Sequence, residues 1–227
     1  MNASPFWERP DIVERFGDRE PDRRLTRWLT QWLTQRDASH LRSLDIGCAA
    51  GRNCRLLAEA GAEVWAVDSS AAMVEAARAR LEPVIGATAA ERRVVRGRMD
   101  DLSSFPDDTF DLVVALGVFQ NAGSADEWER TLAGAARVLA PGGHCLVANF
   151  APDSRPHGVA LERVPGEDDV YYGFGGPHDR ITLLTPDALD ASFARHGLEP
   201  AEPTEAVRVP TERGHRTTVN ALYRKPG

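Results

Sequence analysis

The feature that most constrains this chain is a run of small residues that directly follows an apolar segment. Residues 43–48 have the apolar character of a buried strand, and residues 47–51 read Gly-Cys-Ala-Ala-Gly. A helical pattern over residues 52–60 comes next and stops at Gly61. Small residues in such a turn let the backbone approach a ligand closely. The sequence therefore predicts a strand, a ligand-binding turn and a helix in direct succession.

The alternation of strand and helix continues along the chain. The strand at residues 110–116 is almost wholly apolar, which is typical of a strand buried on both faces of a parallel sheet. Helices are expected after Ser69 or Ser70, after Ser124 and after Thr185, each a good N-cap. This order predicts an α/β fold with right-handed crossovers. The other expected strands cover residues 63–68, 93–97, 144–150, 206–209 and 217–223.

A chain of 227 residues with 42% hydrophobic residues fits a single domain. Its first part carries an amphipathic helix over residues 22–35, with an apolar stripe from Leu25 to Leu33. Residues 151–184 are rich in Pro, Gly and Asp and lack periodicity, which indicates a functional loop or lid. We therefore expect one domain over residues 1–227, made of an N-terminal helical cap (1–40), a core (41–150), a lid (151–184) and a C-terminal helix and hairpin (185–227).

Charge and composition exclude several classes of protein. The formal net charge is -7, whereas a nucleic-acid-binding protein needs a basic surface. No apolar run reaches the roughly 18 residues of a membrane helix, and residues 1–10 lack the order of a signal peptide. The 3 cysteines form no CxxC or Cys/His cluster, so we expect neither disulfides nor a metal. We expect a soluble cytoplasmic protein, a monomer or homodimer, that binds neither membrane nor nucleic acid.

An acidic residue at the end of the second strand indicates the class of ligand. In an open parallel sheet, ligands bind at the carboxyl ends of the strands, and Asp68 lies there. An acid at this place accepts hydrogen bonds from both hydroxyls of a ribose. A dinucleotide site also needs the motif G-x-G-x-x-G. If Gly47 is its first glycine, the second and third glycine positions hold Ala49 and Arg52. The pattern favours an adenosine-containing ligand without a pyrophosphate.

The spacing of the turn resembles the D-x-G-x-G-x-G motif of class I S-adenosylmethionine-dependent methyltransferases of the small-molecule type. Asp45, Gly47 and Gly51 match the motif, and Ala49 replaces its middle glycine. Asp68 stands at the place of the family's ribose acid. Residues 97–102, 105–111 and 139–143 resemble later family segments, so the likeness covers about residues 41–150. It implies a Rossmann-like sheet of seven mostly parallel strands, with helices on both faces and the last strand antiparallel.

The resemblance also implies roles for particular residues. S-adenosylmethionine would be the cofactor, and a methyl group would pass to a small-molecule acceptor by in-line displacement. One departure is Arg98, which stands where many relatives have an acid that faces the adenine amine. The implied cofactor residues are Asp45, Gly47, Ala49 and Gly51 around methionine, Asp68 and Ser69 at ribose, Met99 and Asp100 beside adenine, and Leu116 and Gly117 at the ammonium group.

The acceptor is expected near the ends of the fourth and fifth strands and under the lid. A hydroxyl acceptor of high pKa needs a general base, and His157 and His178 are the candidates. Their alternative role is that of ordinary surface histidines. The candidate substrate-binding residues are Phe119, Gln120 and Asn121 after the fourth strand, Asn149 at the end of the fifth, and Tyr171 and Tyr172 in the lid.

Other functions stay open on sequence alone. An NAD(P)-dependent oxidoreductase also uses this type of sheet, although the third glycine of its turn is missing. A methyltransferase-like protein that binds a partner without transferring a methyl group has no feature against it. A protein or RNA substrate is disfavoured by the acidic balance. The attacking atom of the acceptor, oxygen, nitrogen or sulfur, is not decided by these residues.

Overall fold

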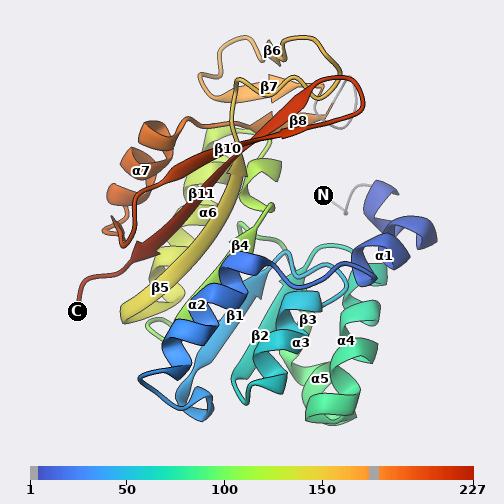
Figure 1. Cartoon of the computed structure of the whole chain (residues 1–227), viewed down its shortest axis with the longest axis vertical. Coiled ribbons are helices and arrows are strands. Elements are labelled where there is room, and N and C mark those ends of the chain that lie inside the picture. The colour runs from blue at the N-terminus through green and yellow to red at the C-terminus, as the bar shows by residue number, and fades with distance from the viewer. Residues whose placement is uncertain (1–4, 174–178) are drawn as a thin grey trace. The chain divides into compact units, whose positions relative to one another are not determined.

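The computed structural model describes residues 5–173 and 179–227. It contains two compact units, and β4 runs from the first into the second (Figure 1). Unit 1 consists of Met1–Met99 and Thr109–Val114, and unit 2 of Asp100–Asp108 and Ala115–Gly227. Each unit is described separately below.

The sheet of unit 1 is parallel throughout. Strand β1 (Arg42–Ile46) pairs with β2 (Glu63–Asp68) on one side and with β4 (Phe110–Leu116) on the other. Strand β2 also pairs with β3 (Val94–Arg96). Side chains such as Leu44, Ala66 and Val113 are fully buried, as the apolar runs predict. The predicted parallel order is confirmed, and it brings the ends of β1 and β2 together.

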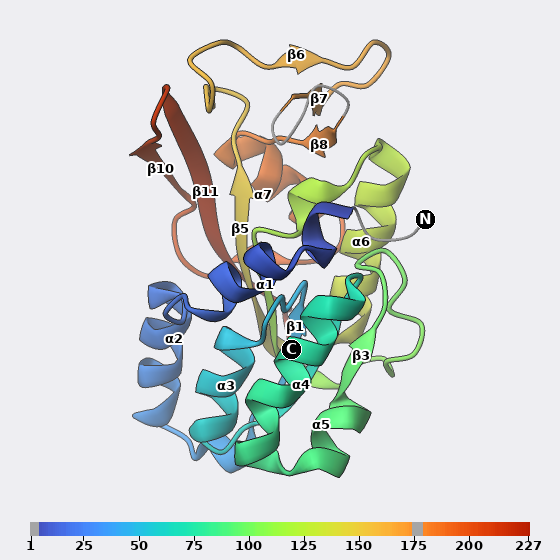
Figure 2. The same ribbon diagram turned by 90° about the vertical axis from the view of Figure 1, so that its right-hand side faces the viewer.

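Helices of unit 1 begin where polar caps stand in the sequence. Ser70 accepts a hydrogen bond from the backbone N–H of Met73 and so caps α4 (Ala71–Ile85). Helix α3 (Arg52–Glu59) packs beside α4, and the short α5 (Ala87–Arg93) was not predicted. Figure 2 shows η1 (Pro5–Glu8) and α1 (Pro10–Gly17) above the upper ends of α3 and α4. Helix α2 (Arg23–Leu33) lies beside α3, and η2 (Ala38–His40) follows it in the chain.

The apolar stripe predicted for α2 reaches Leu33, which is beyond the buried part of the helix. Leu25, Trp28 and Leu29 are buried, but Leu33 is 46% exposed. The helix ends at Leu33, because Thr34 terminates it and its N–H returns to Gln31 and Trp32. The stripe therefore covers two turns of helix, and Leu33 lies outside it.

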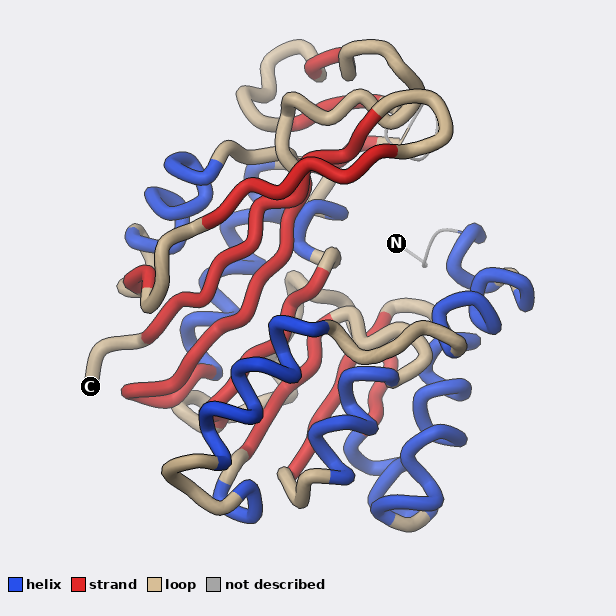
Figure 3. Tube along the Cα trace, viewed as in Figure 1, coloured by secondary structure: helices blue, strands red, loops and turns tan. Residues whose placement is uncertain are grey.

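The strands of unit 2 are antiparallel. Strand β5 (Leu139–Phe150) pairs with β11 (His215–Arg224), which pairs in turn with β10 (Glu205–Pro210) and with the short β9 (Glu199–Pro200) (Figure 3). The predicted C-terminal hairpin and its antiparallel last strand are confirmed. Strand β5 begins before the expected position, because Gly142 and Gly143 exchange backbone hydrogen bonds with Lys225.

The segment expected as an irregular lid holds a small sheet of its own. Strands β6 (Glu162–Arg163), β7 (Val170–Tyr172) and β8 (Arg180–Thr182) are antiparallel to one another. They are too short for a periodic pattern to reveal them. The helical elements of unit 2 are η3 (Phe119–Asn121), α6 (Ala125–Val138) and α7 (Pro186–Ala194). The last two are capped by Ser124 and Thr185, as predicted.

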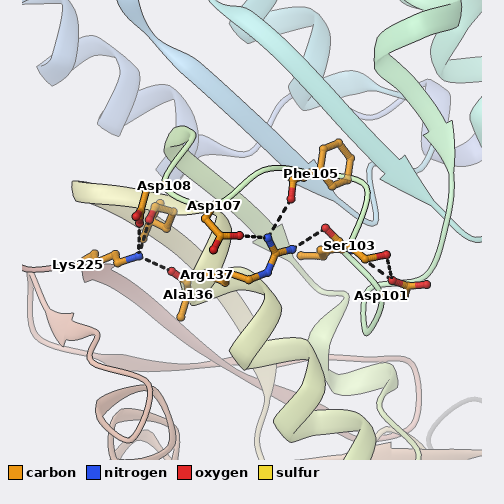
Figure 4. A network of polar contacts seen from close by, with 10 residues as sticks. Asp101, Ser103, Phe105, Asp107, Asp108, Ala136, Arg137 and Lys225 are labelled. Carbon is orange, nitrogen blue, oxygen red and sulfur yellow. Dashed lines mark hydrogen bonds and ion pairs between the residues drawn. The ribbon is translucent and has the colours of Figure 1, made fainter.

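Two basic side chains fix the end of α6 in unit 2 (Figure 4). Arg137 donates to the carbonyl oxygens of Leu102 and Phe105 and pairs with Asp107. Lys225 donates to the carbonyls of Ala136 and Leu139 and pairs with Asp108 at 2.7 Å. The carbonyl of Ala136 is one of the last four of α6, which have no partner within the helix, so the cation of Lys225 satisfies it.

Within residues 5–173 and 179–227, no helix is both long and apolar enough to cross a membrane. The same part of the chain holds no group of three or more His, Cys, Asp or Glu side chains that could bind a metal ion.

Candidate functional site

The turn after β1 has a left-handed backbone at every second residue. Gly47, Ala49 and Gly51 have φ angles of 69°, 48° and 77°. The N–H groups of Gly47 and Cys48 both donate to the carbonyl of Val67 at the end of β2. Glycine adopts this region without strain, whereas an L-residue such as Ala49 does so at a cost of about 1–2 kcal/mol. The alternate positions of the motif thus coincide with the residues of left-handed backbone conformation, and Ala49 is the strained residue among them.

Gly51 is required for a second reason. A Cβ atom at this position would lie 3.0 Å from both Cα and Cβ of Ala77 in α4. The missing side chain lets the start of α3 approach α4 closely. The motif places Gly51 beside the ligand, and the structure adds this packing role.

Asp45, the first residue of the motif, is buried in the interior of unit 1. Its side chain is 2% exposed and accepts a hydrogen bond from Sγ of Cys54 at 3.1 Å. Burial raises the pKa of the Asp45 carboxyl to about 7, against the smaller opposing effect of Cys54. The buried carboxyl of Asp45 therefore bonds to α3 through Cys54, a residue that the motif does not include, and its contact with the methionine part of the cofactor stays a prediction.

Asp68 connects the turn to the start of α4. Its Oδ2 atom accepts from the N–H of Ala49 and its Oδ1 atom from the N–H of Ser70, each at 2.9 Å. Burial raises the pKa of Asp68, although both amide hydrogen bonds favour the charged form. A carboxylate oxygen can accept more than one hydrogen bond, so both oxygens retain capacity for a ligand. Ser69 and Met99 are half-buried residues of the same unit.

The candidate cofactor residues of unit 2 are Leu116 and Gly117, which follow one another in the chain, and Asp100, which is in an ion pair. Gly117 has a φ angle of 81°, and its N–H donates to the carbonyl of Ala148. It is half-buried, as is Leu116. Asp100 forms an ion pair with Arg130 of α6 at 2.9 Å, an interaction that the sequence analysis did not foresee. Its expected contact with adenine stays a prediction.

Two amides of unit 2 have buried oxygens. Gln120 is 3% exposed and Asn149 is fully buried, and within the described part of the chain neither Oε1 of Gln120 nor Oδ1 of Asn149 has a hydrogen-bond partner. The Nδ2 group of Asn149 donates to the carbonyl oxygens of Thr182 and Phe150, which fixes the orientation of the amide. The elements that carry the two residues, η3 and β5, are in contact. Two hydrogen-bond acceptors therefore come from adjacent elements of unit 2.

The other residues expected to bind the methyl acceptor differ in burial and in the side chains that they contact. Phe119 is fully buried and packs between Trp128 and Phe193 in the core of unit 2, so we leave it out of the proposed site. Asn121 is exposed. Tyr171 is 8% exposed, and its hydroxyl accepts from Arg163. Tyr172, the next residue, is half-buried.

One of the two candidate bases lies within the described residues. His157 is exposed in the turn before Gly158. His178 lies outside the described residues. A role for either as a general base stays a prediction.

Comparison with known proteins agrees with this geometry. Residues 44–147 match the family model described as a methyltransferase domain. This range contains the turn, Asp68 and the segments that resemble the family. The chain belongs to the class I S-adenosylmethionine-dependent methyltransferases.

Similar proteins are known among these methyltransferases. A ubiquinone biosynthesis O-methyltransferase of Chelativorans is 30% identical over 181 residues, which cover 78% of this chain and 66% of that protein. The enzyme of the same name from Brucella ovis is 28% identical over 168 residues, or 72% of this chain and 62% of its own. This chain therefore spans less than two thirds of the length of such relatives.

A solved structure supports the fold. The CcbJ methyltransferase from Streptomyces caelestis superposes with a TM-score of 0.66 over 100% of both chains, at 19% sequence identity. At this identity the likeness shows the fold alone. It confirms the Rossmann-like methyltransferase fold that the motifs imply.

Proposed function

We propose that this chain transfers a methyl group from S-adenosylmethionine to a small-molecule acceptor. The observation that carries the proposal is the turn after β1, whose left-handed residues Gly47, Ala49 and Gly51 occupy the motif positions. Asp68 binds the same turn from the end of the next strand. Membership of the methyltransferase family supports this assignment.

The residues of unit 1 fit the proposed cofactor. Both oxygens of Asp68 are held in place by backbone amides, so they are oriented before a ribose arrives. The turn carries no side chain larger than those of Cys48 and the two alanines. A backbone of this kind allows close approach of the methionine part of the cofactor. We assign Asp68 to the ribose and Gly47, Ala49 and Gly51 to methionine.

The reaction needs positioning more than it needs a reactive side chain. S-adenosylmethionine, when bound, supplies a methyl group on a sulfonium sulfur: the acceptor atom bonds to the methyl carbon in line as the carbon–sulfur bond breaks, which leaves S-adenosylhomocysteine, and a hydroxyl acceptor releases its proton to a base or to water. The chain has to bind and orient the acceptor and exclude water. Holding two reactants in line contributes about 7–11 kcal/mol in favourable cases.

We propose a hydroxyl oxygen as the acceptor atom. The buried oxygens of Gln120 and Asn149 can each accept a hydrogen bond from a hydroxyl group. Leaving a buried acceptor without a partner costs about 1–3 kcal/mol, so a ligand that donates to it gains affinity. The similar proteins named O-methyltransferases also support oxygen as the acceptor atom. Tyr172 and the candidate bases His157 and His178 complete the list of residues to test.

A transfer assay tests the proposal. The chain is incubated with S-adenosylmethionine labelled in its methyl group and with sets of phenols, aliphatic alcohols, amines and thiols. We expect label in hydroxyl compounds, with one S-adenosylhomocysteine formed for each methyl transferred. Cofactor binding without any labelled product would instead favour a non-catalytic binding protein. Binding of a reduced nicotinamide cofactor in place of S-adenosylmethionine would favour an oxidoreductase.

A further inference from the structure

The N-terminal segment 5–20 packs directly on the turn after β1. Ile12 of α1 is 3% exposed and forms a buried cluster with Ala50 of the turn and Met73 of α4. Ala49 packs against this cluster, as do Trp7, Val13, Phe16 and Ala76. The methyl group of Ala49, which departs from the family motif, therefore contributes to a contact with the N-terminal segment.

One carboxylate holds the beginning of this segment. Glu8 accepts hydrogen bonds from the N–H of Ala71 at 3.0 Å and from the N–H of Ala72 at 3.1 Å. A third hydrogen bond runs from the hydroxyl of Ser70 to the carbonyl of Trp7. These amides are the first of α4, where a negative charge is favoured by the helix dipole. The backbone amides lower the pKa of Glu8, so its carboxylate is charged at neutral pH.

The other end of the segment is attached differently. Arg80 of α4 donates to the carbonyl of Gly17 at 2.5 Å, and Arg52 of α3 donates to the carbonyl of Glu20 at 3.0 Å. Asn53 accepts from the N–H of Asp22 just beyond. Residues 17–22 are thus tied to α3 and α4 independently of Glu8. The segment therefore has one end anchored through backbone carbonyls and one end held by the polar contacts of Glu8 and Ser70 together with the apolar cluster around Ile12.

We propose that residues 5–20 form an N-terminal lid over the cofactor turn, separate from the lid expected at residues 151–184. Glu8 is the positioning residue that keeps this N-terminal lid closed. The inference rests on the proposed cofactor role of the turn. Asp68 holds the turn through Ala49 and Ser70, and Glu8 holds the lid through the next two amides. Cofactor entry and release then require the end of the lid at η1 to detach from α4. Lids of this type open and close on the microsecond to millisecond scale.

Binding kinetics test the lid. Association and dissociation of S-adenosylhomocysteine are followed by stopped-flow fluorescence, for which Trp7 is a local reporter. Glu8→Ala should raise both rate constants at least fivefold, because the open lid is more populated. Glu8→Gln, which keeps one acceptor oxygen, should have an intermediate effect. Asp11→Asn is the matched control, because this carboxylate of the same segment pairs with the exposed Arg9, and its rate constants should stay within twofold.

A variant that is merely less stable would bind S-adenosylhomocysteine more slowly or to a smaller extent. A rise in the association rate constant therefore distinguishes the opening of a lid from general destabilisation. Unchanged rate constants in Glu8→Ala, or slower association, would overturn the proposal.

Hydrogen exchange of the protein without cofactor gives a second readout. In Glu8→Ala the amides of α1 and of Ala71 and Ala72 should exchange at least tenfold faster, while those of β1 keep their protection. If the unaltered chain fails to bind S-adenosylhomocysteine, the proposed function fails, and exchange still decides whether Glu8 holds the segment. If binding is intact but exchange in α1 is unaltered, the lid is wrong and the function stands.

Discussion

The Oδ2 atom of Asp68 lies 2.9 Å from the backbone nitrogen of Ala49 and accepts its hydrogen bond. The two residues belong to the ends of neighbouring parallel strands, which the register of β1 and β2 brings together. Ala49 is also held in a left-handed conformation. The acid that we assign to the ribose thus fixes the shape of the turn that we assign to methionine. With the assignment proposed above, we expect this contact to couple the binding of the two parts of the cofactor.

Substituting Gly51 tests the packing of the turn. Gly51→Ala combines a left-handed φ with a Cβ atom 3.0 Å from the backbone of Ala77. We expect the free energy of unfolding to fall by about 2–4 kcal/mol, the sum of backbone strain and overpacking. Chemical denaturation measures it. Gly61→Ala is the control for strain alone, since Gly61 has a φ angle of 99° and no atom within 4 Å of its Cβ position. Equal losses in the two variants would contradict the close approach of α3 and α4.

The buried carboxyl of Asp45 predicts a dependence of stability on pH. Its pKa in the folded protein is raised from 3.8 to about 7, so its stabilising effect is present below pH 4 and is lost as the pH rises through 7. By linkage the loss amounts to about 4 kcal/mol at most. Asp45→Asn removes this titration and still provides an oxygen for Cys54. The difference in melting temperature, variant minus unaltered protein, should therefore increase between pH 5 and pH 8. A difference that is independent of pH would show that Asp45 is not buried in this way.

Arg137 is predicted to hold residues 102–107 against α6 in unit 2. Arg137→Ala leaves the carbonyls of Leu102 and Phe105 without their donor and should lower the free energy of unfolding by about 2 kcal/mol. Arg55→Ala is the control, because Arg55 pairs only across one helical turn with Glu59 and both side chains are about half exposed. That loss should be about 0.5 kcal/mol or less. Similar losses in both variants would mean that the hydrogen bonds of Arg137 shown in Figure 4 contribute no more to stability than an exposed ion pair does.

Asn149 is predicted to bind the acceptor and not the cofactor. Asn149→Leu removes its buried oxygen and should raise KM for the acceptor about tenfold, which corresponds to one hydrogen bond of about 1.4 kcal/mol. The Kd for S-adenosylhomocysteine should stay within twofold. Asn220→Leu is a matched control: its Oδ1 atom is also buried without a partner among the described residues, but pairing with Ala148 puts it on the opposite face of the strands. An equal rise of KM in both variants would remove Asn149 from the site.

Much of the fold follows from local sequence. The apolar runs of β1, β2 and β4 and the caps Ser70, Ser124 and Thr185 were sufficient to place the main elements. Short elements escaped detection, because α5 and the strands β6 to β8 are too brief to show a period. Leu33 fits a helical stripe in sequence but falls at the exposed end of its helix.

The cofactor site was more predictable than the acceptor site. Its residues lie at strand ends, which a spacing motif can reveal, and Asp68 and the turn are in contact as that motif implies. Glu8 could not be found in the same way, because its partners Ala71 and Ala72 are 63 and 64 positions away. Phe119 also follows a strand end, but its ring stacks with Phe193 in unit 2, and its contact with the methyl acceptor stays a prediction.

Calorimetric titration with S-adenosylhomocysteine tests the central claim most directly. The account predicts saturable 1:1 binding to the unaltered chain and a Kd at least tenfold weaker for Asp68→Ala, because the ribose loses a charged hydrogen-bonding partner worth about 1.5–3 kcal/mol. Asp11→Asn should bind like the unaltered chain. Absence of binding by the unaltered chain at millimolar ligand, or the same Kd in Asp68→Ala, would contradict the assignment of the turn and Asp68 to this cofactor.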